Sequence, residues 1–165
     1  MWIRAETVAD HDAIHRVTAA AFASAKHASG TEARIVDALR DAGALSLSLV
    51  ADIDGRVAGH VALSPVSLDD GSTGWHGLGP VAVDPRDQGR GVGSALIRAA
   101  LVELPALRAA GCVVLGDPAY YTRFGFRRHA SLRYPGAPAD YFMALSADAA
   151  FPSADVAYHP AFSVA

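Results

Sequence analysis

The sequence predicts an α+β fold in which helices cover one mixed sheet, and three observations predict it. Apolar and polar residues alternate within residues 45–68, which is the period of half-buried strands. Apolar residues recur at helical spacing in two early segments and again after residue 92. The 165 residues are 52% hydrophobic and 19% charged, which suits a single domain over residues 1–165 with its own core.

The first elements of the chain are a short strand and two helices. The strand candidate is the tetrapeptide WIRA that follows the first residue. Thr7 stands three residues before an aspartate, and this capping-box spacing begins a helix over residues 8–22. Ser29 and Glu32 repeat the spacing before a second amphipathic helix, which Gly43 is placed to end.

The middle of the chain predicts a hairpin followed by a third strand. The pair Asp54 and Gly55 supplies the tight turn of the hairpin over residues 45–68. A looser loop, DDGSTGW, leads to a strand over residues 78–84. Pro80 lies inside this strand and cannot donate to a ladder, so it marks an edge or a bulge, unless the strand begins only at the next residue.

The remaining elements alternate between helices and strands. A helix follows the third strand, and the segment PALRAAG is expected to add one last turn past Pro105. A short helix later ends at Gly125. The expected elements are a helix over 92–103, a strand over 112–116, a short helix over 118–124, and two final strands over 141–146 and 156–162.

Composition and charge exclude several classes of protein. The net charge of −3 argues against a nucleic-acid-binding protein, because there is no basic excess to displace counterions from phosphates. The single cysteine, Cys112, cannot form an internal disulfide. The N-terminus does not read as a signal peptide, and no apolar stretch approaches the length of a membrane span. We therefore expect a soluble, cytoplasmic protein.

Three glycines at alternate positions, Gly89, Gly91 and Gly93, open the helix that follows the third strand. The first amides of a helix have no intrahelical partner, and the helix dipole adds positive potential there. Bare backbone would let a phosphate reach these amides, and Arg90 adds charge. The alternative is a plain flexible turn, which one glycine would support better than three. The pattern favours a phosphate site.

Two familiar phosphate-binding motifs do not fit this turn. A Walker loop needs a lysine followed by Ser or Thr after its last glycine, and no lysine stands there. A dinucleotide-binding fingerprint needs G-x-G-x-x-G, but Ser94 interrupts it, and the segment RAAGCVV lacks the required acid. A nucleotide-binding protein of another class is thereby disfavoured.

The pattern that fits is Q-x-x-G-x-G, with Gln88, Gly91 and Gly93 after a strand. Here the chain resembles the GCN5-related N-acetyltransferase (GNAT) family, whose loop of this form holds the pyrophosphate of acetyl-CoA. The segment GDPAYYTRFGF is similar to the closing motif of the family, and LGPVAVDP stands where the family has its acyl-CoA strand. The resemblance covers most of the chain. The segments GLGPVAV, LGDPAYYTRFGF and YFMAL resemble the YhbS-like subgroup.

The resemblance implies a GNAT fold and an activity. The fold would have a mixed central sheet of about six to seven strands, four main helices and a splayed strand pair that holds the coenzyme. The activity would be acetyl transfer from acetyl-CoA, as co-substrate, to a primary amine by direct attack in a ternary complex, without a metal. Two alternatives stay open, namely a non-catalytic acyl-CoA sensor or scaffold, and an enzyme that uses a different acyl-CoA donor.

The resemblance also assigns residues to the coenzyme. Backbone groups of Val81 and Val83 would meet the pantetheine arm and the thioester. Tyr121 matches the family's tyrosine near the coenzyme sulfur and would protonate the departing thiolate, whereas Tyr120 is interpreted as a packing residue. The complete expected set is Val81, Ala82, Val83, Gln88, Gly89, Arg90, Gly91, Val92, Gly93, Ser94, Tyr121 and Phe124.

The general base is the least determined part of the site. The family often has a glutamate on or near its acyl-CoA strand, and this chain has none near residues 78–84. The candidates are His76, His60 and Glu32, each with a structural alternative: an exposed loop residue, a satisfied strand residue and a capping-box acid. A water chain, or an amine that arrives neutral, would need no base.

Other features carry weaker expectations. The segment HDAIH, with His11 and His15, imitates a zinc motif, but two solvated histidines are favoured because no third ligand is evident. Cys112 is expected to be a buried, inert thiol. The pocket for the amine acceptor should be built from the two early helices, their loop over residues 26–31, and the later loops. A homodimer is compatible with the sequence.

Overall fold

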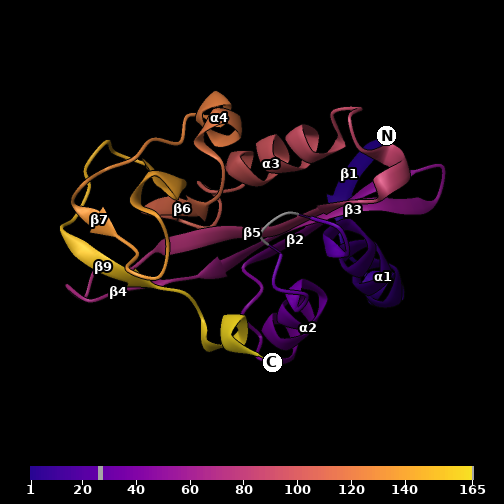
Figure 1. Cartoon of the computed structure of the whole chain (residues 1–165), viewed down its shortest axis with the longest axis horizontal. Coiled ribbons are helices and arrows are strands. Elements are labelled where there is room, and N and C mark those ends of the chain that lie inside the picture. Colours follow the sequence, from indigo (N-terminus) through magenta and orange to yellow (C-terminus); the bar gives the residue numbers. More distant parts are fainter. Residues whose placement is uncertain (26–27, 165) are drawn as a thin grey trace.

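The computed structural model describes residues 1–25 and 28–164, so positions 26 and 27 of the expected acceptor loop lie outside the described residues. A six-stranded sheet has the order β1-β2-β3-β5-β6-β8. Helices α1 and α2 lie on one side of it, and α3 and α4 on the other (Figure 1). The strands are β1 (Trp2–Ala5), β2 (Leu47–Ile53), β3 (Arg56–Pro65), β5 (Trp75–Val83), β6 (Gly111–Leu115) and β8 (Phe142–Ser146), and the helices are α1 (His11–Phe22), α2 (Glu32–Asp41), α3 (Val92–Val102) and α4 (Pro118–Tyr121).

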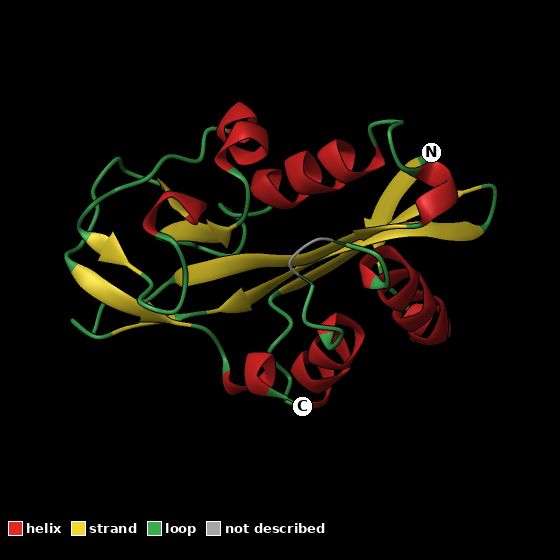
Figure 2. Cartoon of the chain, in the orientation of Figure 1, coloured by secondary structure: helices red, strands yellow, loops and turns green. Residues whose placement is uncertain are grey.

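A second, three-stranded sheet extends one end of the molecule (Figure 2). Its order is β4-β9-β7, from β4 (Ser67–Leu68), β9 (Ala154–Ala157) and β7 (Leu132–Arg133). The expected α+β fold is confirmed, with the described strands divided between these two sheets. No helix in the described ranges combines the length and the apolar character that crossing a membrane requires.

The capping signals in the sequence form as expected at the start of the first helix and at the end of the second. The Thr7 amide donates to the Asp10 carboxylate at 2.7 Å, and a 3-10 turn, Val8–Asp10, leads into α1. Gly43 follows α2 with φ of 65°, and its amide donates to the carbonyl of Arg40 at 3.0 Å. The hairpin turn is confirmed too, because Asp54 and Gly55 have φ of 53° and 81°.

Strand β5 contains the bulge that Pro80 predicts. Val81 pairs with Val61 and Leu78 pairs with Leu63, so Gly79 and Pro80 together oppose a single residue of β3. The strand begins at Trp75, three residues before the expected start. On its other side β5 runs parallel to β6, and this pairing ends at Leu78. Within the described chain no strand pairs with residues 79–83 on that side, so β5 and β6 splay apart.

Apolar side chains from α3 fill the core between that helix and the sheet. Leu96, Ile97 and Ala100 are fully buried at helical spacing. They pack with Val61 and Leu63 of β3 and with other buried residues of the central strands. This packing fixes the start of α3 against the end of β5.

Two predictions of secondary structure are wrong, one for the segment 156–162 and one for the segment that follows α3. The segment 156–162 is not one strand: β9 ends at Ala157 and a 3-10 turn, Pro160–Ser163, follows. Proline lacks an amide to donate and favours the first position of such a turn, where the Ala161 amide bonds the His159 ring. After α3 the chain forms successive turns rather than another helical turn.

Candidate active site

A hollow of about 360 Å³ lies where β5 ends and α3 begins. Most of the residues that the glycine-loop pattern assigns to the coenzyme line it together. The lining residues are Val83, Asp87, Gln88, Gly89, Gly91, Val92, Gly93, Ser94, Tyr120 and Arg123. The loop and α4 therefore enclose one site.

The start of α3 presents free amides to this hollow. The first intrahelical bond runs from the amide of Ala95 to the carbonyl of Gly91 at 3.0 Å, so the three amides before Ala95 have no partner in the helix. Gly91 caps the helix in the left-handed region, with φ of 81°. A Cβ on Gly93 would lie 3.3 Å from the Tyr120 hydroxyl, so a side chain there would enter the hollow. The arrangement suits a phosphate group.

The loop is tied to its surroundings by two polar contacts. The Gln88 side-chain amide donates to the carbonyl of Val83 at 3.0 Å, which joins the loop to the end of β5. Asp87 accepts two bonds from the guanidinium of Arg56, at 2.8 and 3.1 Å. These contacts preorganise the loop before any ligand binds.

The basic residue that lines the hollow is Arg123 rather than Arg90. Arg90 is exposed and is not among the lining residues. The Nε of Arg123 donates to the carbonyl of Tyr120 at 2.9 Å, and its guanidinium lies 4.6 Å from the centre of that ring. Sequence reasoning missed Arg123, although the residue stands inside the quoted GDPAYYTRFGF segment.

A second cavity, of about 380 Å³, lies at the splay between β5 and β6. Its lining combines the β5 bulge with side chains from α1, α2, α4 and the C-terminal segment. The residues are Phe22, Glu32, Ile35, Leu78, Gly79, Pro80, Val81, Leu115, Tyr121, Tyr134, Tyr158 and Phe162. Tyr121 lines this cavity and the adjacent Tyr120 lines the first hollow, so the two sites are neighbours.

Val81 directs its backbone polar groups toward the splay. The amide of Asp84 donates to the carbonyl of Ala58 on β3 at 2.8 Å. Polar groups alternate sides along an antiparallel ladder, so those of Val81 and Val83 point away from β3. The carbonyl of Val83 is already bonded to Gln88, whereas Val81 lies where the pairing with β6 has ended.

Tyr121 is the last residue of α4, and it lines the cavity with its ring against Gly116. A Cβ on Gly116 would lie only 2.4 Å from Cε2 of the ring, so glycine is needed for this approach. Burial, with a smaller contribution from Tyr120, raises the pKa of the Tyr121 phenol to about 12. The phenol is therefore fully protonated at neutral pH, which is the state of a proton donor.

Three other expected coenzyme residues have mainly packing side chains. Ala82 is 2% exposed and faces the core under α1 and α2. Val92 and Phe124 are buried in the core beneath α3, although Val92 also touches the hollow. Only their backbone, or the edge of Val92, can meet a ligand at these positions.

Glu32 lies on the cavity wall, and its carboxylate is already engaged. It accepts from the Ser29 amide at 2.9 Å and from the Gly30 amide at 3.1 Å. Burial alone would raise the pKa of Glu32, but these hydrogen bonds outweigh it and the pKa is lowered. The expected contact between Ser29 and Glu32 forms, but α2 begins at Glu32 with Thr31 as its N-cap, so the predicted capping box with Ser29 at the N-cap is wrong. A carboxylate that stays ionised is a weak base.

His76 does not meet Tyr121 in the cavity. It lies within β5 rather than in the loop before the strand, and its Nδ1 is 3.0 Å from the Ser46 hydroxyl. It lines a different hollow, beside the DDGSTGW loop. Burial lowers the pKa of its imidazole. The geometry brings Tyr121 and Glu32 to one cavity and leaves His76 outside it.

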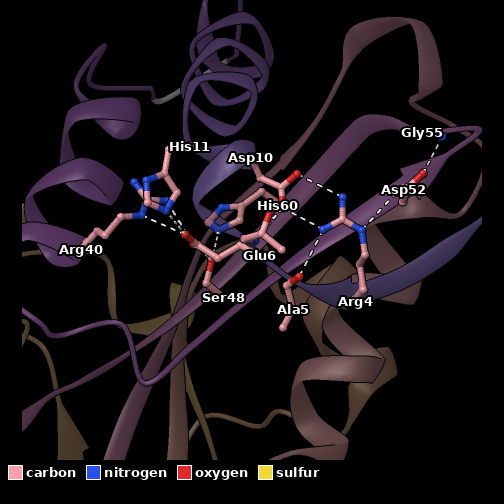
Figure 3. Close-up of polar contacts among 11 residues, drawn as sticks. Arg4, Ala5, Glu6, Asp10, His11, Arg40, Ser48, Asp52, Gly55 and His60 are labelled. Carbon is pink, nitrogen blue, oxygen red and sulfur yellow. Dashed lines mark hydrogen bonds and ion pairs between the residues drawn. The ribbon is translucent and has the colours of Figure 1, made fainter.

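His60 belongs to a buried polar cluster between β3 and the first two helices. Figure 3 shows Arg40 and His11 converging on Glu6, next to Ser48 and His60. Glu6 accepts a bond from the Ser48 hydroxyl, which lies 2.7 Å from Nε2 of His60. Burial lowers the pKa of His60 to about 4, so the ring is neutral. It is a packed strand residue outside both cavities.

His11 and His15 each contact a carboxylate, and Cys112 lies in the core. His11 contacts Glu6 at 2.8 Å, and His15 contacts Asp37 at 2.7 Å. In the ranges that the structure describes, no three metal-ligating side chains gather at one point. Cys112 is fully buried, and burial raises the pKa of its thiol to about 12, as expected for an inert thiol.

The aromatic wall of the second cavity was missed by sequence reasoning. Tyr134, Tyr158 and Phe162 come from the connection after β7 and from the segment that follows β9. Tyr158 was expected to lie in a strand, where nothing would assign it to a site. The signal was present only as the density of aromatic residues in the last third of the chain.

The fold and the two adjacent hollows together define a class of protein. A bulged strand splayed from its parallel neighbour, followed by a glycine turn at a helix start, is the arrangement implied by the resemblance to acyl-CoA-dependent acyltransferases. The family model described as an acetyltransferase (GNAT) domain matches residues 44–128.

Relatives support the same assignment over most of the chain. YhbS of Escherichia coli K12, an uncharacterised N-acetyltransferase, is 39% identical over 142 residues, which cover 82% of this chain and 85% of that protein. YjhQ of the same strain, also an uncharacterised N-acetyltransferase, is 33% identical and covers 80% and 71%. The chain belongs to the GNAT family of acetyltransferases.

Two solved structures match almost the whole chain. A GNAT acetyltransferase from Brucella melitensis in complex with acetyl-CoA superposes with a TM-score of 0.87 at 48% identity, over 98% of this chain and 97% of that one. YhbS from E. coli in complex with CoA gives a TM-score of 0.87 at 36% identity, over 99% and 92%. Their fold is the fold of this chain.

Proposed function

We propose that this chain transfers an acetyl group from acetyl-CoA to a primary amine by direct attack in a ternary complex. The observation that carries the proposal is the adjacency of two hollows, one lined by free helix amides and one by the splayed strand and Tyr121. The Brucella relative was solved with acetyl-CoA and YhbS with CoA, which supports the same co-substrate here.

The first hollow would bind the pyrophosphate of the coenzyme. The amides before Ala95 donate to its oxygens, and the helix dipole and Arg123 add positive potential. The net charge of the chain, −3, would not attract an anion by itself. Binding therefore depends on local backbone geometry. Gln88 contributes by fixing the loop to β5, and Arg90 by its charge alone.

The second cavity would hold the reacting groups. The neutral amine attacks the thioester carbonyl, and the Val81 amide donates to the oxygen that becomes negative. When the intermediate collapses, the carbon–sulfur bond breaks and the Tyr121 phenol gives its proton to the departing thiolate. The attacking nitrogen carries a positive charge once the carbon–nitrogen bond has formed, and the proton that it loses to solvent restores the phenol of Tyr121. The products are the N-acetylated amine and CoA thiol.

The proposal needs no side-chain base. Glu32 is ionised and engaged by backbone amides, so its lowered pKa makes it a weak proton acceptor. His76 and His60 lie outside the cavity. The amine therefore enters the reaction in its neutral form or loses its proton to water. The rate should follow the neutral fraction of the amine.

Thiol release over a panel of primary amines tests the function, with calorimetry of acetyl-CoA as a separate measurement of binding. Amine-dependent release of CoA thiol is expected. Binding of acetyl-CoA without release over the whole panel would identify a sensor or scaffold. Faster release from propionyl-CoA or succinyl-CoA would identify a different donor.

Two further expectations from the sequence stay predictions. A cytoplasmic location agrees with a buried free thiol and with a co-substrate of central metabolism. A homodimer is the second, and the sedimentation of the purified chain would test it.

A further inference from the structure

The cavity at the splay is walled largely by apolar and aromatic side chains. The ring centres of Tyr134 and Tyr158 are 5.3 Å apart, and those of Tyr158 and Phe162 are 5.0 Å apart, so the three rings form one continuous wall. Phe22 and Ile35 extend this wall from α1 and α2. Such a surface favours an apolar ligand, because a charged group would lose its water without gaining a partner.

Glu32 is the only charged side chain among the residues that line this cavity, all of which lie in the described part of the chain. Its carboxylate is held in place by the backbone of Ser29 and Gly30. A fixed negative charge attracts an ammonium ion and repels a carboxylate. The cavity therefore accepts one positive charge and disfavours acids.

Tyr158 supplies a polar group that the described residues leave without a partner. Its hydroxyl oxygen is shielded from solvent and makes no hydrogen bond within residues 1–25 and 28–164, although the residue as a whole is partly exposed. A buried hydroxyl without a partner is costly. Tyr158 lines the cavity, so a small rotation of its side chain on binding would present this hydroxyl to a ligand that supplies the missing partner.

We propose that the acceptor is a primary monoamine with an apolar or aromatic body and no carboxylate, and that the Tyr158 hydroxyl bonds its amino group. This inference rests on the acetyltransferase function proposed above. The aromatic wall binds the body, Glu32 draws in the cationic form, and the amine becomes reactive once it is neutral. A second ammonium on the body has no carboxylate to meet within the cavity lining.

Two matched pairs of amines test the substrate class, with thiol release measured at saturating acetyl-CoA. Hexylamine and 1,6-diaminohexane differ by one ammonium. 2-Phenylethylamine and phenylalanine differ by one carboxylate. In each pair the amine without the extra charge, hexylamine or 2-phenylethylamine, should have a kcat/KM at least about tenfold higher. Burying one unpaired charge in an apolar site costs at least the free energy that corresponds to this factor. Nα-acetyl-lysine amide serves as a model of a protein lysine and should react more slowly than hexylamine.

Two variants test the residues. Tyr158→Phe keeps the ring and should raise the KM for 2-phenylethylamine about 5- to 10-fold without changing the KM for acetyl-CoA. Tyr141→Phe, at an exposed tyrosine outside the cavity lining, is the matched control and should change neither constant. Glu32→Gln removes the charge and should narrow the preference for 2-phenylethylamine over phenylalanine.

The outcomes separate this inference from the function on which it rests. A higher kcat/KM for 1,6-diaminohexane, phenylalanine or Nα-acetyl-lysine amide overturns the substrate class and leaves the transferase intact. An unchanged KM in a folded Tyr158→Phe variant overturns the role of Tyr158. Bound acetyl-CoA with no thiol release from any amine overturns the transferase and the substrate class together.

Discussion

Replacing Gly116 by alanine should move Tyr121 without touching the glycine loop. The new Cβ would lie 2.4 Å from Cε2 and 2.8 Å from Cδ2 of the Tyr121 ring. Carbon atoms in contact are normally about 3.5–4.0 Å apart, so the ring must retreat by roughly 1.1–1.6 Å. A displacement of about 1 Å at a reacting group can cost about 100-fold in rate, or roughly 2.7 kcal/mol of transition-state stabilisation.

The assay compares kcat/KM for amine acetylation in four proteins: the natural chain, Gly116→Ala, Tyr121→Phe and the double variant. If Gly116 acts by positioning the phenol, Gly116→Ala should lower kcat/KM about 100-fold in the natural chain. The same substitution should lower kcat/KM only slightly in the Tyr121→Phe background, where the hydroxyl is absent. Gly136→Ala is the matched control, because its Cβ would meet the Tyr134 ring at an ordinary 3.4 Å. Melting curves check that each variant folds, since overpacking costs about 1–3 kcal/mol. Full activity in Gly116→Ala, or equal further loss in the double variant, would refute the reasoning.

Three other predictions follow from the same geometry. The enzyme should contribute no inflection between pH 6 and 8 to kcat/KM, which should instead rise with the neutral fraction of each amine; an inflection near pH 6.5 shared by amines of different basicity would indicate a histidine base. Burial lowers the pKa of His60 to about 4, so the unfolded chain takes up a proton first as the pH falls. Between pH 7 and pH 5 this should lower the free energy of unfolding, measured in urea, by about 2 kcal/mol. In His60→Gln the free energy of unfolding should depend less on pH over this range, and an equal dependence on pH in the two proteins would contradict the prediction. Arg123→Gln should weaken acetyl-CoA binding by calorimetry about 3- to 10-fold and more than Arg90→Gln does, because only Arg123 lines the hollow; a larger effect at Arg90 would reverse the assignment.

The loop and the bulge could be predicted because their causes are local. Three glycines before an apolar helical stripe indicate a backbone that approaches a ligand. Pro80 in a strand indicates an interrupted hydrogen-bond ladder, and the register of β3 and β5 shifts around it as expected. These signals depend on the conformational limits of single residues, which the sequence states directly.

The acceptor cavity could not be predicted because its parts are distant in sequence. Glu32, Tyr121 and Tyr158 meet only after the two sheets and α2 have packed together. The Tyr158 ring can approach because Gly77 has no side chain: a Cβ there would lie 2.7 Å from the ring. No local sequence pattern at Gly77 or Tyr158 indicates that the two residues are in contact. The sequence therefore predicts a strand at Tyr158, and it leaves His76 as a candidate base.

Binding of the coenzyme through bare helix amides is tested most directly by calorimetry with two ligands. Acetyl-CoA carries the pyrophosphate, and S-acetylpantetheine has the same thioester arm without it. In a folded Gly93→Val variant, the new side chain enters the hollow beside Tyr120. The dissociation constant of acetyl-CoA should rise at least about tenfold, while that of S-acetylpantetheine stays the same. Unchanged acetyl-CoA affinity in the folded variant would contradict the account.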